Sequence, residues 1–188
     1  GPQQNPDEIM YNHGIHGVQD MCNLLIRNNK KFLLEVGHWK ESDVLDRVAS
    51  CAKAAQVANN LKNARVGIIG EPFKGMGDFA IPAEILKKTI GIETISFDFS
   101  TGQELVSQIS HEEVLMEMKE NESLFTINNL DNEVHERSSR INLLIRKWIK
   151  KEKLTAFTLN FLATSRDSII SVMPFLEASK AMSKGIGY

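Results

Sequence analysis

Apolar and polar positions follow two different periods along the chain, and these periods predict strands and helices in alternation. Short apolar runs predict strands over residues 32–36, 65–69, 93–97, 124–127 and 154–159. Apolar residues three and four positions apart predict helices over 17–28, 102–109 and 131–151, and helices that begin near Ser42, Pro82, Ser110 and Pro174. This alternation favours an α/β fold with three layers, in which a largely parallel sheet carries helices on both faces, as in Rossmann and flavodoxin-like domains.

Helix-end signals support the same division of the chain. Pro82 suits a first helical turn and Gly91 suits the position after a helix ends. Ser110 and Glu113 have the spacing of a capping box. Residues 1–12 contain prolines and several amides and are expected to form a linker or leading arm, and 13–188 are expected to form a single α/β domain.

A polar, glycine-rich loop follows the strand at 65–69 and is the first candidate site. It carries two acids, one base and two large apolar side chains: Glu71, Asp78, Lys74, Phe73 and Met76. In open α/β sheets, ligands bind just beyond the carboxyl ends of the strands. We therefore expect Glu71, Phe73, Met76 and Asp78 to bind a small molecule. The alternative is that the loop carboxylates are solvated and pair with a helix dipole.

Two histidines, His13 and His16, form the second candidate site. Gly14 lies between them and Gly17 follows, so two imidazoles can be aimed at one point. Imidazole suits metal binding, proton transfer and hydrogen bonding to sugar hydroxyls. The alternative is two exposed loop histidines. His135, Glu136, Arg137 and Arg140, near the start of a long predicted helix, are expected to be surface groups.

Composition narrows the class of protein. The chain of 188 residues is 42% hydrophobic and 24% charged, with a net charge of −2, which argues against a nucleic-acid-binding surface. The basic residues that cluster late in the chain are expected to form a solvated helix face: Arg140, Arg146, Lys147, Lys150, Lys151 and Lys153. Cys22 and Cys51 sit in apolar helical patterns, which indicates a reducing compartment. With no apolar run long enough to span a membrane, we expect a soluble cytoplasmic protein.

Known motifs are missing, which limits the chemistry that residues alone can predict. The glycines do not spell the dinucleotide-binding pattern, and no phosphate loop, zinc-peptidase motif or nucleophile elbow occurs. A nucleotide-binding flavodoxin-like domain is therefore the weaker alternative.

Five short segments, in their order and spacing, resemble the central region of the L-arabinose/L-fucose isomerase superfamily. They are Met10-Tyr11-Asn12 with His16-Gly17, Val36-Gly37-His38-Trp39, the run from Arg65 to Glu71, Ala156-Phe157-Thr158, and the run from Lys184 to Tyr188. Members of this family convert aldoses to ketoses with a divalent metal, usually Mn²⁺. They are cytoplasmic homo-oligomers with active sites at subunit contacts.

The resemblance implies roles for particular residues. His16 matches a histidine that reaches the sugar in a neighbouring subunit's site, and His13 matches a nearby amide residue with the same role. Phe73 matches a large apolar residue beside the substrate. The chain is then part of a metal-dependent aldose–ketose isomerase acting on a pentose or 6-deoxyhexose.

Two departures from the family pattern qualify this expectation. Leu162 stands where the family has a metal-binding glutamate, and a leucine cannot bind Mn²⁺. The family's remaining metal ligands follow the point that matches Tyr188, so we expect the catalytic C-terminal part and the Mn²⁺ ligands to lie outside this chain. Leu162 also motivates an alternative, a non-catalytic sugar-binding or regulatory module of the same fold.

Overall fold

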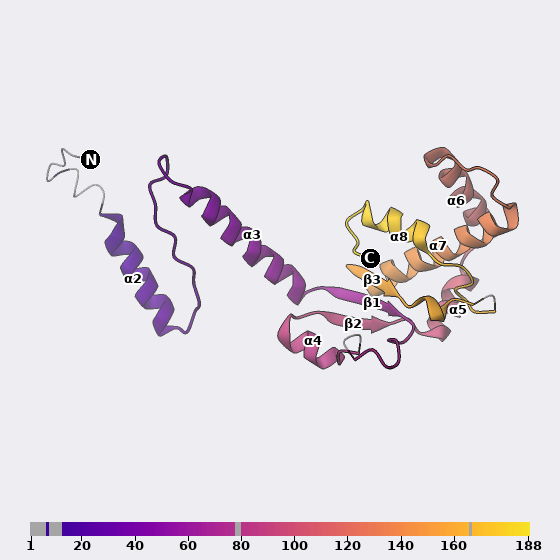
Figure 1. Cartoon of the computed structure of the whole chain (residues 1–188), viewed down its shortest axis with the longest axis horizontal. Coiled ribbons are helices and arrows are strands. Elements are labelled where there is room, and N and C mark those ends of the chain that lie inside the picture. The colour runs from indigo at the N-terminus through magenta and orange to yellow at the C-terminus, as the bar shows by residue number, and fades with distance from the viewer. Residues whose placement is uncertain (1–6, 8–12, 78–79, 166) are drawn as a thin grey trace. The chain divides into compact units, whose positions relative to one another are not determined.

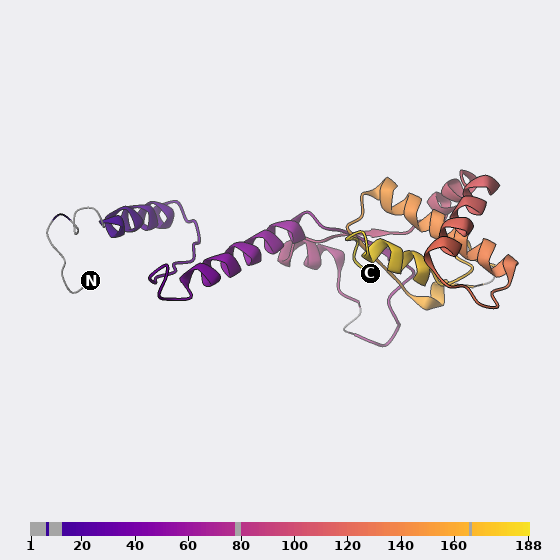
Figure 2. The ribbon, with the colours of Figure 1, turned by 90° about the horizontal axis from the view of Figure 1, so that it is seen from above.

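The computed structural model describes residues 7, 13–77, 80–165 and 167–188. It divides the chain into two compact units, Gly1–Gln56 and Val57–Tyr188, which are described separately below (Figures 1 and 2). Apart from Asp7, the predicted arm over 1–12 lies outside the described residues. A single domain over 13–188 stays a prediction.

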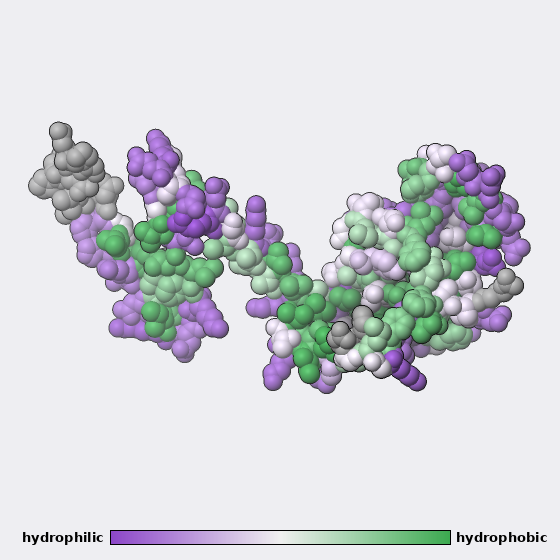
Figure 3. Space-filling view, viewed as in Figure 1, coloured by the Kyte–Doolittle hydropathy of each residue, from purple (hydrophilic) through white to green (hydrophobic). Residues whose placement is uncertain are grey.

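The first unit holds α2 (Gly14–Arg27) and most of α3 (Val44–Lys62). α2 confirms the helix predicted over 17–28 and begins three residues earlier. Ser42 stands two residues before α3, as predicted, and its hydroxyl accepts a hydrogen bond from the Val44 amide at 3.3 Å. Val44 is the one buried residue among the described positions 13–56. Figure 3 accordingly shows many apolar residues on the surface of this unit.

The strand predicted over 32–36 is wrong. Residues 31–38 form no regular secondary structure, and Leu33, Leu34 and Val36 are exposed. An apolar run becomes a strand only where a neighbouring strand pairs with its backbone groups. No described segment pairs with this one.

The second unit is built on a parallel sheet of three strands in the order β2-β1-β3. The strands are β1 (Arg65–Ile69), β2 (Glu93–Ser96) and β3 (Ala156–Leu159). Gly67, in the middle of β1, pairs in register with Ile95 on one side and with Phe157 on the other. All three strands lie within runs that the sequence predicts. Near the end of the chain, Gly187 forms a further parallel bridge to Ala156.

Helices fill the connections between the strands and also follow β3 (Figure 1). They are α4 (Ala83–Thr89), α5 (Phe99–Ser107), α6 (His111–Leu124), α7 (Asn132–Glu152) and α8 (Phe175–Met182), with a short 3-10 turn, η1 (Phe161–Ala163). The β1-to-β2 and β2-to-β3 crossovers run in opposite directions across the sheet. Right-handed crossovers in opposite directions place their helices on opposite faces. The predicted three-layer α/β fold is confirmed.

The core lies between the sheet and α7. A Cβ on Gly67 would come within 2.4 Å of the Trp148 ring and 2.6 Å of the Leu154 side chain, so the missing side chain lets α7 approach the sheet. Four apolar residues of α7 are buried: Ile141, Leu144, Ile145 and Trp148. Burial of such side chains supplies most of a domain's stability.

The predicted helix ends agree with the structure. The Ser110 hydroxyl accepts from the Glu113 amide and the Glu113 carboxylate accepts from the Ser110 amide, which completes the capping box of α6. Pro82 precedes α4, and Gly91 follows it with a positive φ of 89°. The strand predicted over 124–127 is wrong, because Leu124 ends α6 and no described strand pairs with the residues after it.

The basic face of α7 is solvated only in part: Lys150, Lys151 and Lys153 are exposed as predicted, but Arg146 is partly buried. Arg146 donates two hydrogen bonds to Glu117 of α6, at 2.8 and 2.9 Å, and two to Glu177 of α8, at 2.9 and 2.6 Å. The two glutamate side chains are only 2% and 4% exposed. Lys180 adds a bond to Glu117 at 2.8 Å. Complementary charges on two neighbouring helices thus hold Arg146 in a partly buried position, although the sequence pattern places it in water.

His135 is also buried, contrary to the expected surface position, whereas Arg137 and Arg140 are partly exposed. Among the described residues, no helix combines the length and apolar character needed to cross a membrane.

Candidate functional site

The strand order places a crevice between β1 and β3. The chain leaves β1 toward α4 on one face of the sheet, and it leaves β3 toward α8, which packs on α7. Adjacent parallel strands whose connections diverge in this way open a crevice at their carboxyl ends, where ligands bind in open α/β sheets.

A cavity of about 250 Å³ occupies this position. It is lined by the ends of β1 and β3 and the loops after them: Ile68, Ile69, Gly70, Glu71, Pro72, Phe73, Thr158, Leu159 and Asn160. Most of the lining is apolar, with a carboxylate, an amide and a hydroxyl among it. Small-molecule sites typically have this composition, with few polar groups that fix orientation. We call it the switch-point pocket.

Gly70 shapes the wall of the switch-point pocket. Its φ is +86°, and a Cβ there would lie 2.8 Å from the Cβ of Ala163 and 3.2 Å from that of Asn160. The close approach and the left-handed backbone therefore both require glycine.

Asn160 joins the two loops of the pocket. Its backbone amide donates to the Ile69 carbonyl at 2.9 Å, and its side-chain oxygen accepts from the Leu162 amide at 2.9 Å. Its side-chain nitrogen donates to the Glu71 carbonyl. These bonds fix the loop after β1 against η1, and so position Glu71.

The structure brings together part of the predicted loop site. Glu71 and Phe73 line the switch-point pocket, and the Phe73 ring lies 5.3 Å from the Phe161 ring. Met76 is 49% exposed and does not line the pocket. Asp78 lies outside the described residues. Asn160 and Thr158 line the pocket but were missed by sequence reasoning, although a polar residue directly after a predicted strand is the signal that would find Asn160.

The predicted histidine pair is close together in the first unit. The His13 and His16 rings stack with centroids 4.3 Å apart and planes 8° from parallel, and both residues are exposed. His13 stands at the N-cap position of α2, without a side-chain capping bond. The two imidazoles therefore lie face to face at the start of α2.

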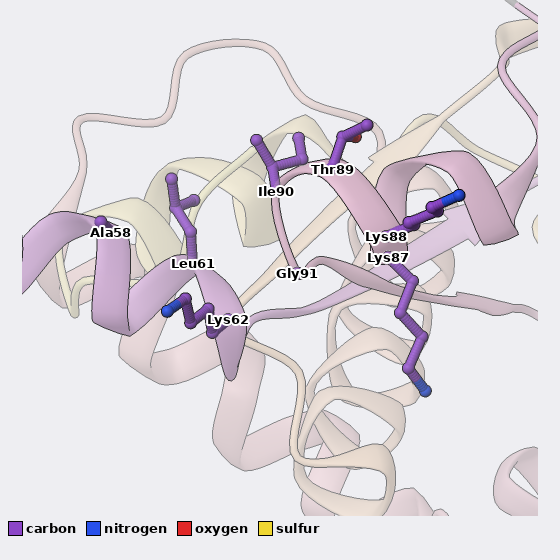
Figure 4. Close-up of a pocket in the computed structure, with 8 residues that line it drawn as sticks. All are labelled: Ala58, Leu61, Lys62, Lys87, Lys88, Thr89, Ile90 and Gly91. Atoms are coloured by element: carbon purple, nitrogen blue, oxygen red, sulfur yellow. The ribbon is translucent and has the colours of Figure 1, made fainter. Parts of the chain in front are cut away.

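A larger cavity, of about 470 Å³, lies at the opposite edge of the sheet, where α3 and α4 end (Figure 4). Its lining includes Lys62, Lys87 and Lys88 around the apolar side chains of Leu61 and Ile90. In Figure 4 the three lysine side chains extend away from one another. They do not converge on a common point, so this cavity offers no assembled anion site.

Comparison with known proteins points to a distant relative. No family model matches the chain. L-arabinose isomerase of Shouchella clausii (strain KSM-K16) is 24% identical to it over 187 residues, which cover 97% of this chain. The chain is a distant relative of that isomerase. It spans 37% of the isomerase's length.

The residues that the structure describes do not fit a manganese site. Leu162, at the position of the expected glutamate, is 69% exposed in η1 and has no ligand atom. Across the described part of the chain, no group of three or more His, Cys, Asp or Glu side chains could hold a metal ion. Glu71 is the one carboxylate that lines the switch-point pocket, among the residues described.

Proposed function

We propose that this chain is the central α/β part of a metal-dependent aldose–ketose isomerase that acts on a pentose or a 6-deoxyhexose. The observation that carries the proposal is the distant relation to L-arabinose isomerase, which extends over 97% of the chain. The switch-point pocket supports it, because its volume of about 250 Å³ suits a monosaccharide and its lining mixes apolar and polar groups.

In this proposal the chain's own residues bind the sugar. The Glu71 carboxylate accepts hydrogen bonds from sugar hydroxyls, and the Asn160 amide holds the Glu71 backbone in place. Phe73 offers an apolar surface to the sugar carbons. His13 and His16 bind hydroxyls of a sugar held by a neighbouring copy of the protein.

The remaining expectations are proposals of the same kind. The protein is a cytoplasmic homo-oligomer, with active sites where copies meet. We propose Mn²⁺ for the complete enzyme only, and its ligands would come from outside this chain.

Leu162 favours a second candidate function, a sugar-binding or regulatory module without catalysis. This module would bind polyols independently of metal and convert no aldose.

Turnover by the complete protein tests both candidates. L-arabinose and L-fucose are each incubated with the protein and Mn²⁺, and the ketose product is measured. We expect ketose formation, and we expect His16→Ala to lower kcat/KM about tenfold, the effect of losing a hydrogen bond to the substrate, with an unchanged melting temperature.

His111→Ala is the matched control, since His111 is an exposed histidine on α6. It should leave kcat/KM unchanged. Saturable sugar binding without any ketose would favour the regulatory module, and equal losses in both histidine variants would remove the role of His16.

A further inference from the structure

A third cavity, of about 300 Å³, lies between α5, α7 and the segment before α8, away from the switch-point pocket. Arg137 and Arg140 of α7 line it, together with Gln103 and Ser107 of α5 and Ser171. Part of the remaining lining is apolar, including Ile141 and Ile169. Two guanidinium groups thus border a partly apolar hollow, where electrostatic attraction is stronger than in open water.

No carboxylate lines this cavity among the described residues. Each arginine has one acidic neighbour one turn earlier on α7. Arg137 lies 3.8 Å from Glu133, which is 85% exposed, and Arg140 lies 3.4 Å from Glu136. Glu136 is in turn shared with His111 at 3.6 Å. Exposed pairs of this length are weak and give way readily to a better-placed anion.

Arg146, on the same helix, is an arginine that holds neighbouring helices together, and its hydrogen bonds provide a comparison. Its guanidinium makes four hydrogen bonds of 2.6 to 2.9 Å to two buried carboxylates. Arg140 makes one, at 3.4 Å. Hence most of the donors of Arg137 and Arg140 remain available.

One of these donors is buried as well as unpartnered. The Nε of Arg137 is out of contact with solvent and has no hydrogen-bond acceptor among the described residues. Buried donors in folded proteins are nearly always paired, so an orphaned one points to a missing acceptor. Because Arg137 lines the cavity, an oxyanion bound there could supply this acceptor.

We propose that this cavity binds the phosphate group of a small phosphate monoester. A phosphate presents three terminal oxygens and a charge near −2, which matches two guanidinium groups and neighbouring polar side chains. A carboxylate has only two oxygens and one charge, and would leave donors unused. The apolar wall suits the organic part of the monoester. This site is separate from the proposed sugar site and independent of the proposed isomerase activity.

The test follows the melting temperature of the intact chain during titration with inorganic phosphate, ribose 5-phosphate, ribose and acetate, at constant ionic strength. A ligand that binds only the folded state raises the melting temperature in a saturable way. We expect a saturable rise with both phosphates, a larger one with ribose 5-phosphate, and none with ribose. If only inorganic phosphate raises the melting temperature, the site binds the free ion, and the proposal of a monoester ligand is overturned.

The variant pair Arg137→Gln with Arg140→Gln should weaken phosphate binding about tenfold or more, because charge-assisted hydrogen bonds are lost. The control pair Lys87→Gln with Lys88→Gln removes the same charge from the cavity near α4 and should leave binding unchanged. Absence of a saturable rise in the wild type, or equal weakening in both pairs, overturns the proposal. Equally strong binding of acetate overturns the choice of phosphate.

Discussion

The two units of this chain have similar sequence patterns and very different interiors. Residues 57–188 bury a continuous core around Trp148 and Phe157, whereas the described residues 13–56 bury Val44 alone. Both α2 and α7 are amphipathic in sequence, but α2 has no buried residue and α7 has seven. An amphipathic pattern therefore predicts that a helix forms, while burial depends on which other elements cover its apolar face.

Charges show the same difference between the units. Arg146 joins α6, α7 and α8 through buried carboxylates, but Arg47 bonds to Glu35 and Asp43 near the surface of the first unit. Matched substitutions, one in each unit, test whether this difference in burial governs stability.

The largest effect is expected for Arg146→Ala. Without the guanidinium, both carboxylates stay buried, and among the described residues Glu117 keeps an ion pair with Lys180 whereas Glu177 keeps none. Breaking a buried ion pair costs about 3–5 kcal/mol. Chemical denaturation followed by the fluorescence of buried Trp148 measures the free energy of unfolding. The matched change Arg47→Ala should alter that free energy much less. Equal losses would show that the ion pairs do not distinguish the units.

The second-largest loss of stability is expected when a buried leucine is truncated to alanine. Leu144 is fully buried in α7, so Leu144→Ala should cost about 2–5 kcal/mol by lost burial and a cavity. Leu24 is 61% exposed in α2, so Leu24→Ala should stay within about 0.5 kcal/mol. The denaturant midpoints of the two variants measure these losses in unfolding free energy. A large loss from Leu24→Ala would mean that α2 is covered in solution.

The same contrast explains which elements the sequence could predict. Strands β1, β2 and β3 were predictable because their apolar runs coincide with real pairing partners. The runs over 32–36 and 124–127 have equal apolar character but no described partner, and a local pattern carries no information on pairing. The capping box of Ser110 and Glu113 was predictable because it is a contact within one turn.

The candidate site was predictable to a similar extent. Glu71 and Phe73 follow a recognisable strand directly, so position along the chain is enough to place them at the carboxyl edge. Asn160 contributes because β3 lies next to β1, and that adjacency joins residues about 90 positions apart. The partial burial of Arg146 likewise depends on glutamates from two other helices, which the periodicity of α7 does not reveal.

Acid should weaken the second unit through its ionic network. Burial by itself raises the pKa of the Glu117 carboxyl, but hydrogen bonds from Arg146 and Lys180 outweigh it and hold that pKa below the usual 4.5. The Lys147 hydrogen bond likewise lowers the pKa of Glu113. The folded state then binds fewer protons than the unfolded state, so this stability is present above about pH 4.5 and is lost as the pH falls through the lowered values.

Melting temperature measured against pH checks this expectation. The wild-type curve should fall below about pH 4.5, and Glu117→Gln should flatten it, because the group that takes up the proton is gone. Glu112→Gln, at an exposed position of the same helix, should leave the shape of the curve unchanged. An identical slope in the Glu117 variant would remove the network as the cause.

Removing a helix cap should have the smallest effect on the free energy of unfolding, and one cap can be removed in each unit. Ser110→Ala removes one bond of the capping box of α6 and should lower the free energy of unfolding by about 1 kcal/mol. Ser42 lies before α3, where its hydroxyl accepts from Val44 at 3.3 Å and donates to the His38 carbonyl at 2.8 Å. Both caps are local contacts, but only α6 is packed into a core. Ser110→Ala should therefore shift the cooperative transition seen by Trp148, whereas Ser42→Ala should speed amide exchange at the start of α3 and leave that transition in place. A shift of the Trp148 transition by Ser42→Ala would show that the two units unfold together.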